Sequence, residues 1–118
     1  MYLQKELNQI EAIPQRAGKG VSMKMLISST EAPNFAMRNF IIESGGHMPL
    51  HTNTVEHEQF VLAGKAEVQV DDKTIVAKAG DILLIPAGVA HSYKTIGDES
   101  YSFLCLVPNK EDCIKIID

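Results

Sequence analysis

The 118-residue chain lacks the features that mark several large classes of protein. Its two cysteines, Cys105 and Cys113, are too few for a disulfide framework or a Cys-type zinc site. Eleven Lys and Arg residues stand against fifteen Asp and Glu, with no basic cluster, which disfavours nucleic-acid binding. No apolar run approaches the ~18 residues that cross a bilayer, and the first residues, MYLQKELNQIEAIP, include no apolar signal segment. We therefore expect a cytoplasmic protein that binds neither nucleic acid nor a membrane.

What the sequence does contain is a series of short apolar runs separated by Gly, Asp and Pro. Several runs alternate apolar and polar residues, and two of them meet in a tight turn at 70–73. The expected strands cover residues 21–27, 35–43, 48–51, 58–64, 66–71, 74–78, 81–86, 91–96 and 101–108. Strands of this length without a helical period predict an all-β sandwich or barrel. We expect one domain, with an N-terminal arm at 1–20, a barrel at 21–108 and a C-terminal tail at 109–118.

Three of the four histidines lie in one stretch, GGHMPLHTNTVEHEQFVLAG, at 45–64. The hypothesis is that His51, His57 and His91 meet inside the barrel and hold a metal ion, with Asn53 beside them. Buried imidazoles need hydrogen bonds or charged partners, and ligation to one ion would satisfy all three at once. The alternative is that His51 and His57 face solvent in loops while His91 caps a turn.

The spacing of these residues resembles the two motifs of the cupin family. In the first motif, which is Gly-x5-His-x-His-x3–4-Glu-x6-Gly in the family, the matching residues here are Gly45, His51, Asn53, His57 and Gly64. In the second motif they are Gly80, Pro86, Gly88 and His91, with Thr95 where Asn is usual. The resemblance implies a double-stranded β-helix (jelly-roll) barrel of the small, single-domain cupin type-2 class.

A narrower resemblance covers much of the remaining sequence, at 32–40, 56–65 and 103–108. These segments are similar to prokaryotic cupins in which histidine replaces the motif glutamate and four histidines hold manganese. The resemblance implies that His51, His57 and His91 are ligands, and that Asn53 occupies the place of the fourth histidine. The site is then three histidines with Asn53, three histidines with extra water, or poor in metal. His47 is expected at the pocket rim or on the surface, the alternative being that a bend at Met48-Pro49 brings it inward as a substitute ligand. Glu56 and Glu58 are expected to face away from His57.

The same resemblance implies further residues and partners around the site. It places Arg38, Met48, Phe103 and Cys105 on the wall of the pocket, and it implies a homodimer. Manganese is the metal that the resemblance implies, while imidazole ligands also suit Fe, Ni, Cu and Zn. The leading hypothesis for function is an oxygenase-type metalloenzyme acting on a small molecule. The alternatives are a non-catalytic small-molecule or metal-binding module and a metal-free or zinc-bound isomerase.

Overall fold

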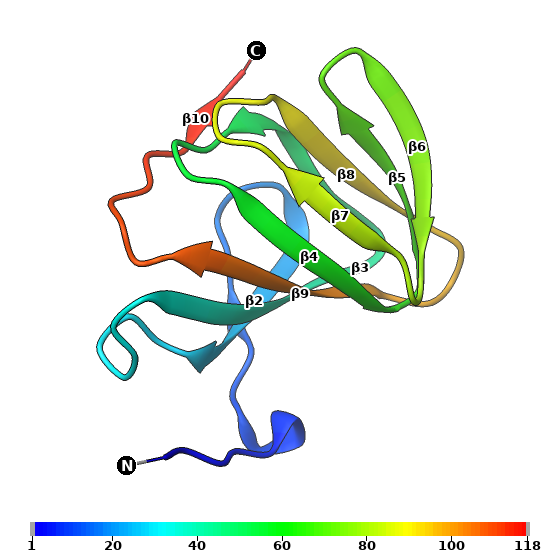
Figure 1. Cartoon of the computed structure of the whole chain (residues 1–118). Helices are drawn as coiled ribbons and strands as arrows, with labels where there is room; N and C mark the ends of the chain where they lie inside the picture. The colour runs from blue at the N-terminus through cyan, green and yellow to red at the C-terminus, as the bar shows by residue number, and fades with distance from the viewer. Residues whose placement is uncertain (1, 118) are drawn as a thin grey trace.

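The computed structural model describes residues 2–117 and is built almost entirely of β-strands (Figure 1). The strands are β1 (Ile13–Pro14), β2 (Lys19–Ile27), β3 (Phe35–Thr52), β4 (His57–Ala63), β5 (Lys65–Val70), β6 (Lys73–Lys78), β7 (Ile82–Ile85), β8 (His91–Ile96), β9 (Tyr101–Pro108) and β10 (Lys115–Ile116). A single 3-10 turn, η1 (Leu7–Gln9), precedes them. Among residues 2–117, no helix is long and apolar enough to cross a membrane.

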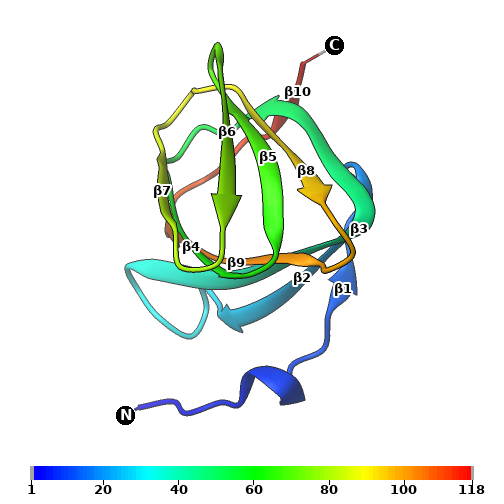
Figure 2. The same cartoon turned by 90° about the vertical axis from the view of Figure 1, so that its right-hand side faces the viewer.

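One curled sheet forms the barrel, with strands paired in the order β6-β5-β8-β3-β9-β4-β7. The strands β6 and β7 stand at opposite ends of this order, yet only a short turn at 79–81 separates them in the chain. The sheet must therefore curl so that β6 and β7 approach each other at this turn, and Figure 2 shows the curled sheet from another side. The turn is fastened to β4, because the N–H of Gly80 donates to the carbonyl of Val61 over 2.9 Å. The prediction of an all-β jelly-roll barrel is confirmed.

The longest strand is β3. The sequence predicted two separate strands here, divided at Ser44-Gly45-Gly46. Strand β3 runs for 18 residues, pairing first with β2 and β9 and then, from His47 onward, with β8. Gly46 lets the chain bend without breaking, since a Cβ there would stand 2.6 Å from the carbonyl oxygen of Lys19. The bend carries the end of β3 from one wall of the barrel to the other.

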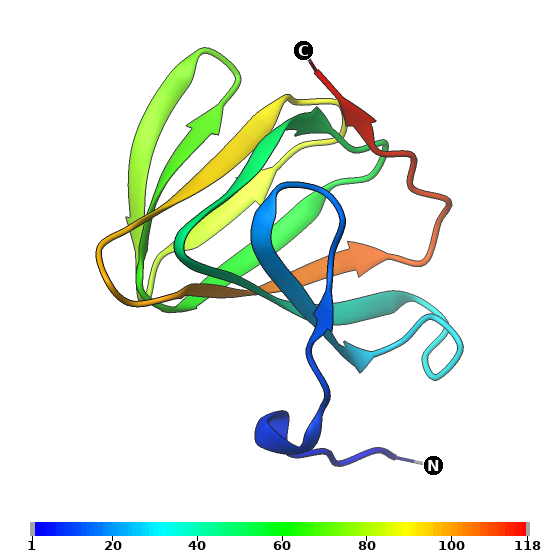
Figure 3. The same cartoon turned by 180° about the vertical axis from the view of Figure 1, so that it is seen from behind.

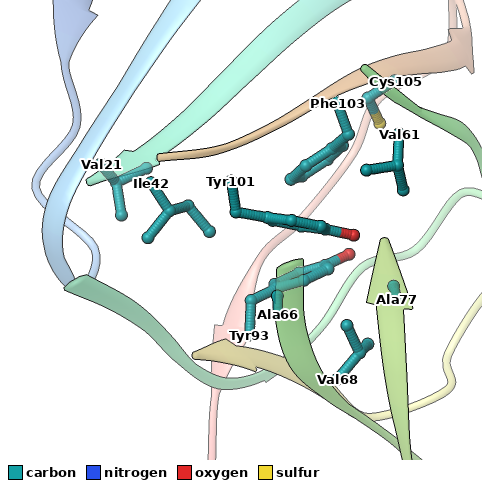
Figure 4. Close-up of a cluster of buried hydrophobic side chains, with 10 residues drawn as sticks. All are labelled: Val21, Ile42, Val61, Ala66, Val68, Ala77, Tyr93, Tyr101, Phe103 and Cys105. Carbon is teal, nitrogen blue, oxygen red and sulfur yellow. The ribbon is translucent and has the colours of Figure 1, made fainter. Parts of the chain in front are cut away.

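Inward-facing side chains fill the closed end of the barrel with apolar groups. The rings of Tyr93, Tyr101 and Phe103 gather at its centre, with centroids 5.3 Å apart for Tyr93 and Phe103 (Figure 4). Burial alternates strictly along β4, where His57, Gln59 and Val61 are buried while the residues between them are exposed. The polar side chains of His57 and Gln59 on this inward face line a cavity inside the sheet.

Two terminal segments add short strands to the barrel. β1 pairs with β2, and β10 pairs with the end of β3, so that Ile116 lies opposite His51 and Lys115 opposite Thr52. Figure 3 shows the C-terminal segment, in red, beside the end of β3. The sequence predicted neither strand, because two residues are too few to show an alternating pattern.

Candidate metal centre

The three histidines of the two motifs meet at one end of the barrel. His51 lies near the end of β3, while His57 and His91 begin β4 and β8. His51 and His91 are opposite one another across β3 and β8, with ring centroids 4.2 Å apart, and the ring of His57 lies 6.2 Å from that of His91. All three side chains are buried. The alternative in which His51 and His57 face solvent from loops is therefore wrong.

Two of the imidazoles are held in the form that a metal ion requires. His51 Nδ1 lies 2.8 Å from the carbonyl oxygen of Pro49, and His91 Nδ1 lies 3.0 Å from that of Val89. A carbonyl can only accept, so Nδ1 carries a proton in both rings, and in the neutral ring Nε2 is the nitrogen that keeps its lone pair. Burial lowers the pKa of His91 to about 4, so this ring is neutral at pH 7. The two carbonyls thus fix the orientation of both rings, and His91 presents an uncharged nitrogen donor.

His57 is engaged at both nitrogens. Its Nε2 lies 3.3 Å from Oδ2 of Asp112, and its Nδ1 lies 3.3 Å from Sγ of Cys105. Burial, reinforced by the positive charge of Arg38, lowers the pKa of His57, and burial raises the pKa of Cys105. A neutral imidazole beside a carboxylate donates from Nε2, while the Cys105 thiol donates to Nδ1. The contact with Asp112 is therefore a hydrogen bond from a neutral ring.

Asn53 carries a buried polar atom without a partner. Its Nδ2 donates to Oδ2 of Asp112 over 3.2 Å, but its Oδ1 makes no hydrogen bond to any described residue. Gln59, one step further inward on β4, leaves its Oε1 in the same condition while its Nε2 donates to the hydroxyl of Tyr93. Such atoms are costly in a folded protein, and an amide oxygen beside imidazole nitrogens is a suitable donor for a cation.

These side chains line a cavity of about 130 Å³. Arg38, Met48, Phe103 and Cys105, which the family resemblance placed at the pocket, also line it. Arg38 extends toward the interior, where its Nη2 donates to Cys105 Sγ over 3.3 Å and its guanidinium carbon lies 5.0 Å from the centre of the Phe40 ring. Its Nε is buried and has no partner among the described residues. The cavity thus combines apolar walls with one cationic group.

Three residues close in sequence to the candidate ligands do not face the cavity. His47 is exposed, and Glu56 and Glu58 point outward, as alternation along the strand predicted. Within residues 2–117, no three His, Cys, Asp or Glu side chains are arranged to hold a metal ion as they stand. The donor set nevertheless fits a divalent transition metal, because two fixed imidazoles and an unpartnered amide oxygen lie together. His57 can join this set only when Asp112 gives up its bond to Nε2 or binds the same ion.

Sequence reasoning missed Asp112, which lies outside both motifs and carries no spacing that links it to His57. Gln59 could have been found, since alternation from His57 already placed it on the inward face. The positions of His57 and Gln59 follow from the geometry of the strand that carries them. The position of Asp112 depends instead on the path of the irregular segment that follows β9.

The Cupin domain family matches residues 38–107, which include every histidine of the site. The chain belongs to the cupin family. Among curated proteins, this cupin is 28% identical over 76 residues to 1-methylthio-D-xylulose 5-phosphate methylsulfurylase of Rhodospirillum rubrum. The match covers 64% of this chain and 49% of that protein. The cupin therefore spans about half the length of the curated relative.

Solved structures repeat the fold over the whole chain. The polyketide cyclase RemF from Streptomyces resistomycificus superposes with a TM-score of 0.93 at 24% identity, covering 100% of this cupin and 87% of RemF. A cupin 2 domain-containing protein from Halorhodospira halophila is 30% identical, with a TM-score of 0.78 over 84% of this chain and 71% of that one. At this level of identity the likeness to RemF establishes the barrel alone.

Proposed function

We propose that this cupin is a metalloprotein in which His51, His57 and His91 hold one divalent transition metal, with Asn53 as a further donor. The observation that carries the proposal is the pair of imidazoles whose Nδ1 atoms are held by Pro49 and Val89, together with an Asn53 amide oxygen that no residue among 2–117 satisfies. Three nitrogens and one amide leave coordination positions for a small molecule. We further propose an oxygenase-type reaction on a small organic substrate.

The remaining groups of the cavity would bind and orient that substrate. A redox-active metal, when bound, supplies a Lewis acid and an electron partner for O₂ or for a chelating substrate. Arg38 offers a buried guanidinium nitrogen without a partner, which suits an anionic group such as a carboxylate or an enolate. Phe103 and Met48 provide apolar contacts on the wall and limit the entry of water. The proposed substrate class is therefore a small anion with an apolar part.

The metal site can be tested on protein purified without chelators. Elemental analysis is expected to find about one transition metal per chain, and calorimetry with Mn²⁺ to find one site. His51→Ala, His57→Ala and His91→Ala should each abolish binding, while the matched exposed variant His47→Ala keeps it. Wild-type protein that neither contains nor takes up a metal would refute the proposal, and equal loss in His47→Ala would show that the ligands are wrong.

Oxygen uptake separates the oxygenase from a binding module. Metal-loaded protein is screened in an oxygen electrode against small carboxylates and enolisable ketones, with Arg38→Met as a variant expected to raise KM for the anionic compounds. Consumption of O₂ that depends on both metal and substrate supports the enzyme. Binding of such anions without turnover would instead indicate a non-catalytic small-molecule module.

We also propose that two copies associate through the outer face of β4 and β7. Ile82 is 77% exposed and Leu84 is 58% exposed on β7, and Phe60 is exposed on the adjacent strand. Large apolar side chains that cluster on one face of a sheet favour burial against another surface. A second copy of this chain presents the same face, which suits the two-fold symmetry of most homodimers.

A further inference from the structure

The tail that follows β9 returns to the open end of the barrel and brings Asp112 into the centre of the site. Oδ2 of Asp112 lies 3.3 Å from Nε2 of His57 and 3.2 Å from Nδ2 of Asn53. These partners are two of the four positions proposed above as donors. One carboxylate oxygen of Asp112 therefore contacts both His57, whose Nε2 is engaged in this bond, and Asn53, which stands where the family resemblance implies a fourth histidine.

The distance between Asp112 and His57 is that of two ligands on one ion. Two ligand atoms each about 2.1 Å from a metal lie about 3.0 Å apart at a right angle and about 3.4 Å apart at a tetrahedral angle. Once Nε2 gives its lone pair to an ion, it has no proton to donate to the carboxylate. An oxygen 3.3 Å away then loses its hydrogen bond and gains most by binding the same ion.

The charges around the candidate site also favour Asp112 as a ligand. The three histidines and Asn53 bring no negative charge to a divalent cation, and Arg38 adds a positive charge nearby through its contact with Cys105. The side chain of Asp112 is only 21% exposed, so solvent screens its charge weakly. Among residues 2–117, the carboxylate of Asp112 is the anionic group that contacts the proposed metal donors.

The position of Asp112 is fixed by the tail rather than left to a mobile side chain. Its Oδ1 accepts from the N–H of Thr54 over 3.0 Å, and the Thr54 hydroxyl accepts from the N–H of Cys113 over 2.9 Å. Beyond it, β10 pairs with β3, and the N–H of Ile117 donates to the carbonyl of Leu50 over 2.9 Å. The tail is thereby held on both sides of Asp112 against the segment that carries His51 and Asn53.

We propose that Asp112 is a carboxylate ligand of the metal, supplied by the C-terminal tail in place of the missing fourth histidine. This inference rests on the proposed metal site. Metal binding takes His57 to its other neutral tautomer, with the Nδ1 proton facing Cys105 and Nε2 free for the ion. Asp112 then exchanges a hydrogen bond for a coordinate bond without leaving its place beside Thr54.

The test compares metal affinity and metal spectra in matched variants of the full chain. Calorimetry with Mn²⁺ is expected to show affinity at least about tenfold weaker in Asp112→Asn and weaker still in Asp112→Ala. Glu111→Gln, which removes the same charge from the neighbouring exposed residue, should bind like the wild type. Co²⁺ serves as a second probe, because its visible absorption depends on the ligands it holds. Asp112→Asn should change that spectrum, while Glu111→Gln should not.

The results separate this inference from the metal site itself. Unchanged Mn²⁺ affinity and an unchanged Co²⁺ spectrum in Asp112→Asn, alongside loss of binding in His91→Ala, would overturn the ligand role and leave the metal site standing. A variant whose metal-free form melts earlier but whose metal properties are unchanged would show a structural role only, and would also overturn it. Wild-type protein that binds neither ion would refute both.

A second variant guards against poor folding of Asp112→Asn. Thr54→Val keeps every proposed donor but removes the hydroxyl that bonds the tail next to Asp112. It should fold and bind Mn²⁺ several-fold more weakly than the wild type, with a Co²⁺ spectrum broadened toward that of Asp112→Asn. Wild-type affinity in Thr54→Val together with wild-type affinity in Asp112→Ala would end the proposal.

Discussion

Two buried asparagines, Asn39 in β3 and Asn53 directly after this strand, allow a test of whether Asn53 contributes to stability or to metal binding. Asn39 is 2% exposed, and its Nδ2 donates to the Ser102 hydroxyl over 2.9 Å and to two backbone carbonyls. Asn53 is 5% exposed, makes one side-chain hydrogen bond and leaves Oδ1 unsatisfied. The change to leucine keeps the branched shape of either side chain while removing its polar atoms.

The expected cost of each change follows from its bonds. The Asn39 amide has two N–H groups for three acceptors, so Asn39→Leu removes about two hydrogen bonds worth about 1 kcal/mol each and should destabilise the protein by about 2 kcal/mol. Asn53→Leu removes one bond to a carboxylate, worth about 2 kcal/mol, but also removes an unsatisfied buried oxygen that costs about 1–3 kcal/mol. The two terms nearly cancel, and Asp112 keeps its bonds to Thr54 and His57. Metal-free Asn53→Leu should therefore unfold within about 1 kcal/mol of the wild type.

The assay is urea unfolding of chelator-treated protein, followed by calorimetry with Mn²⁺ on the same samples. Asn53→Leu should retain stability and lose at least about tenfold in metal affinity, whereas Asn39→Leu should lose stability and, where folded, keep its affinity. A loss of stability in Asn53→Leu equal to that of Asn39→Leu would refute the reasoning, since Asn53 would then be a structural residue. Unchanged metal affinity in Asn53→Leu would refute its role as a donor.

Three further outcomes are expected. In metal-free protein the folded pKa of His91 is about 4 and lies below its ordinary value of 6.5. Between these two pKa values the unfolded chain therefore binds a proton at this residue, whereas the folded chain does not. The free energy of unfolding should fall by up to about 3 kcal/mol from pH 6.5 to pH 4, and urea titrations of His91→Gln should not show this fall. Gly64→Ala should cost about 2–5 kcal/mol, because its φ is +79° and the new Cβ would collide with the carbonyl oxygen of Ser100, whereas Gly80→Ala, with φ at +92° and open space, should cost only about 1–2 kcal/mol in thermal unfolding. Gel filtration with light scattering should give the mass of two chains for the wild type and one for Ile82→Glu/Leu84→Glu, and a wild-type mass of one chain would refute the proposed dimer.

The sequence predicted those parts of the fold in which a local rule decides the outcome. Alternation along β4 placed His57 and Gln59 inward, and the turn at 70–73 joins β5 to β6 with Val70 paired to Lys73. The break expected at Ser44-Gly45-Gly46 was wrong because glycine has two uses in strands. Here it admits the close approach of Lys19 and a bend, rather than ending the strand.

The candidate site was predictable where motif spacing or alternation along a strand places its residues. The resemblance placed Cys105 on the wall of the pocket, and this is compatible with its burial in the core. The residue is buried in the core, and its sulfur also contacts His57 and Arg38 at the cavity wall. Asp112 could not be found in this way, because its position depends on the hydrogen bonds of Thr54 to the tail. Such tertiary contacts leave no periodic trace in the sequence.

The exchange of a histidine for Asn53, which the family resemblance implies, and the proposed ligation by Asp112 would together form one change in the chemistry of the site. Asn53 is short enough to donate to the carboxylate from Nδ2 while its Oδ1 stays unpartnered for a cation. The proposed donor set then has three imidazole nitrogens and two oxygens, one of them charged, where the resemblance implies four nitrogens. Oxygen donors suit Mn²⁺, whereas imidazole suits Zn²⁺ and Cu²⁺. Asp112→His would reverse this exchange, and by the same reasoning it should shift the relative affinity from Mn²⁺ toward Zn²⁺ in competitive calorimetry.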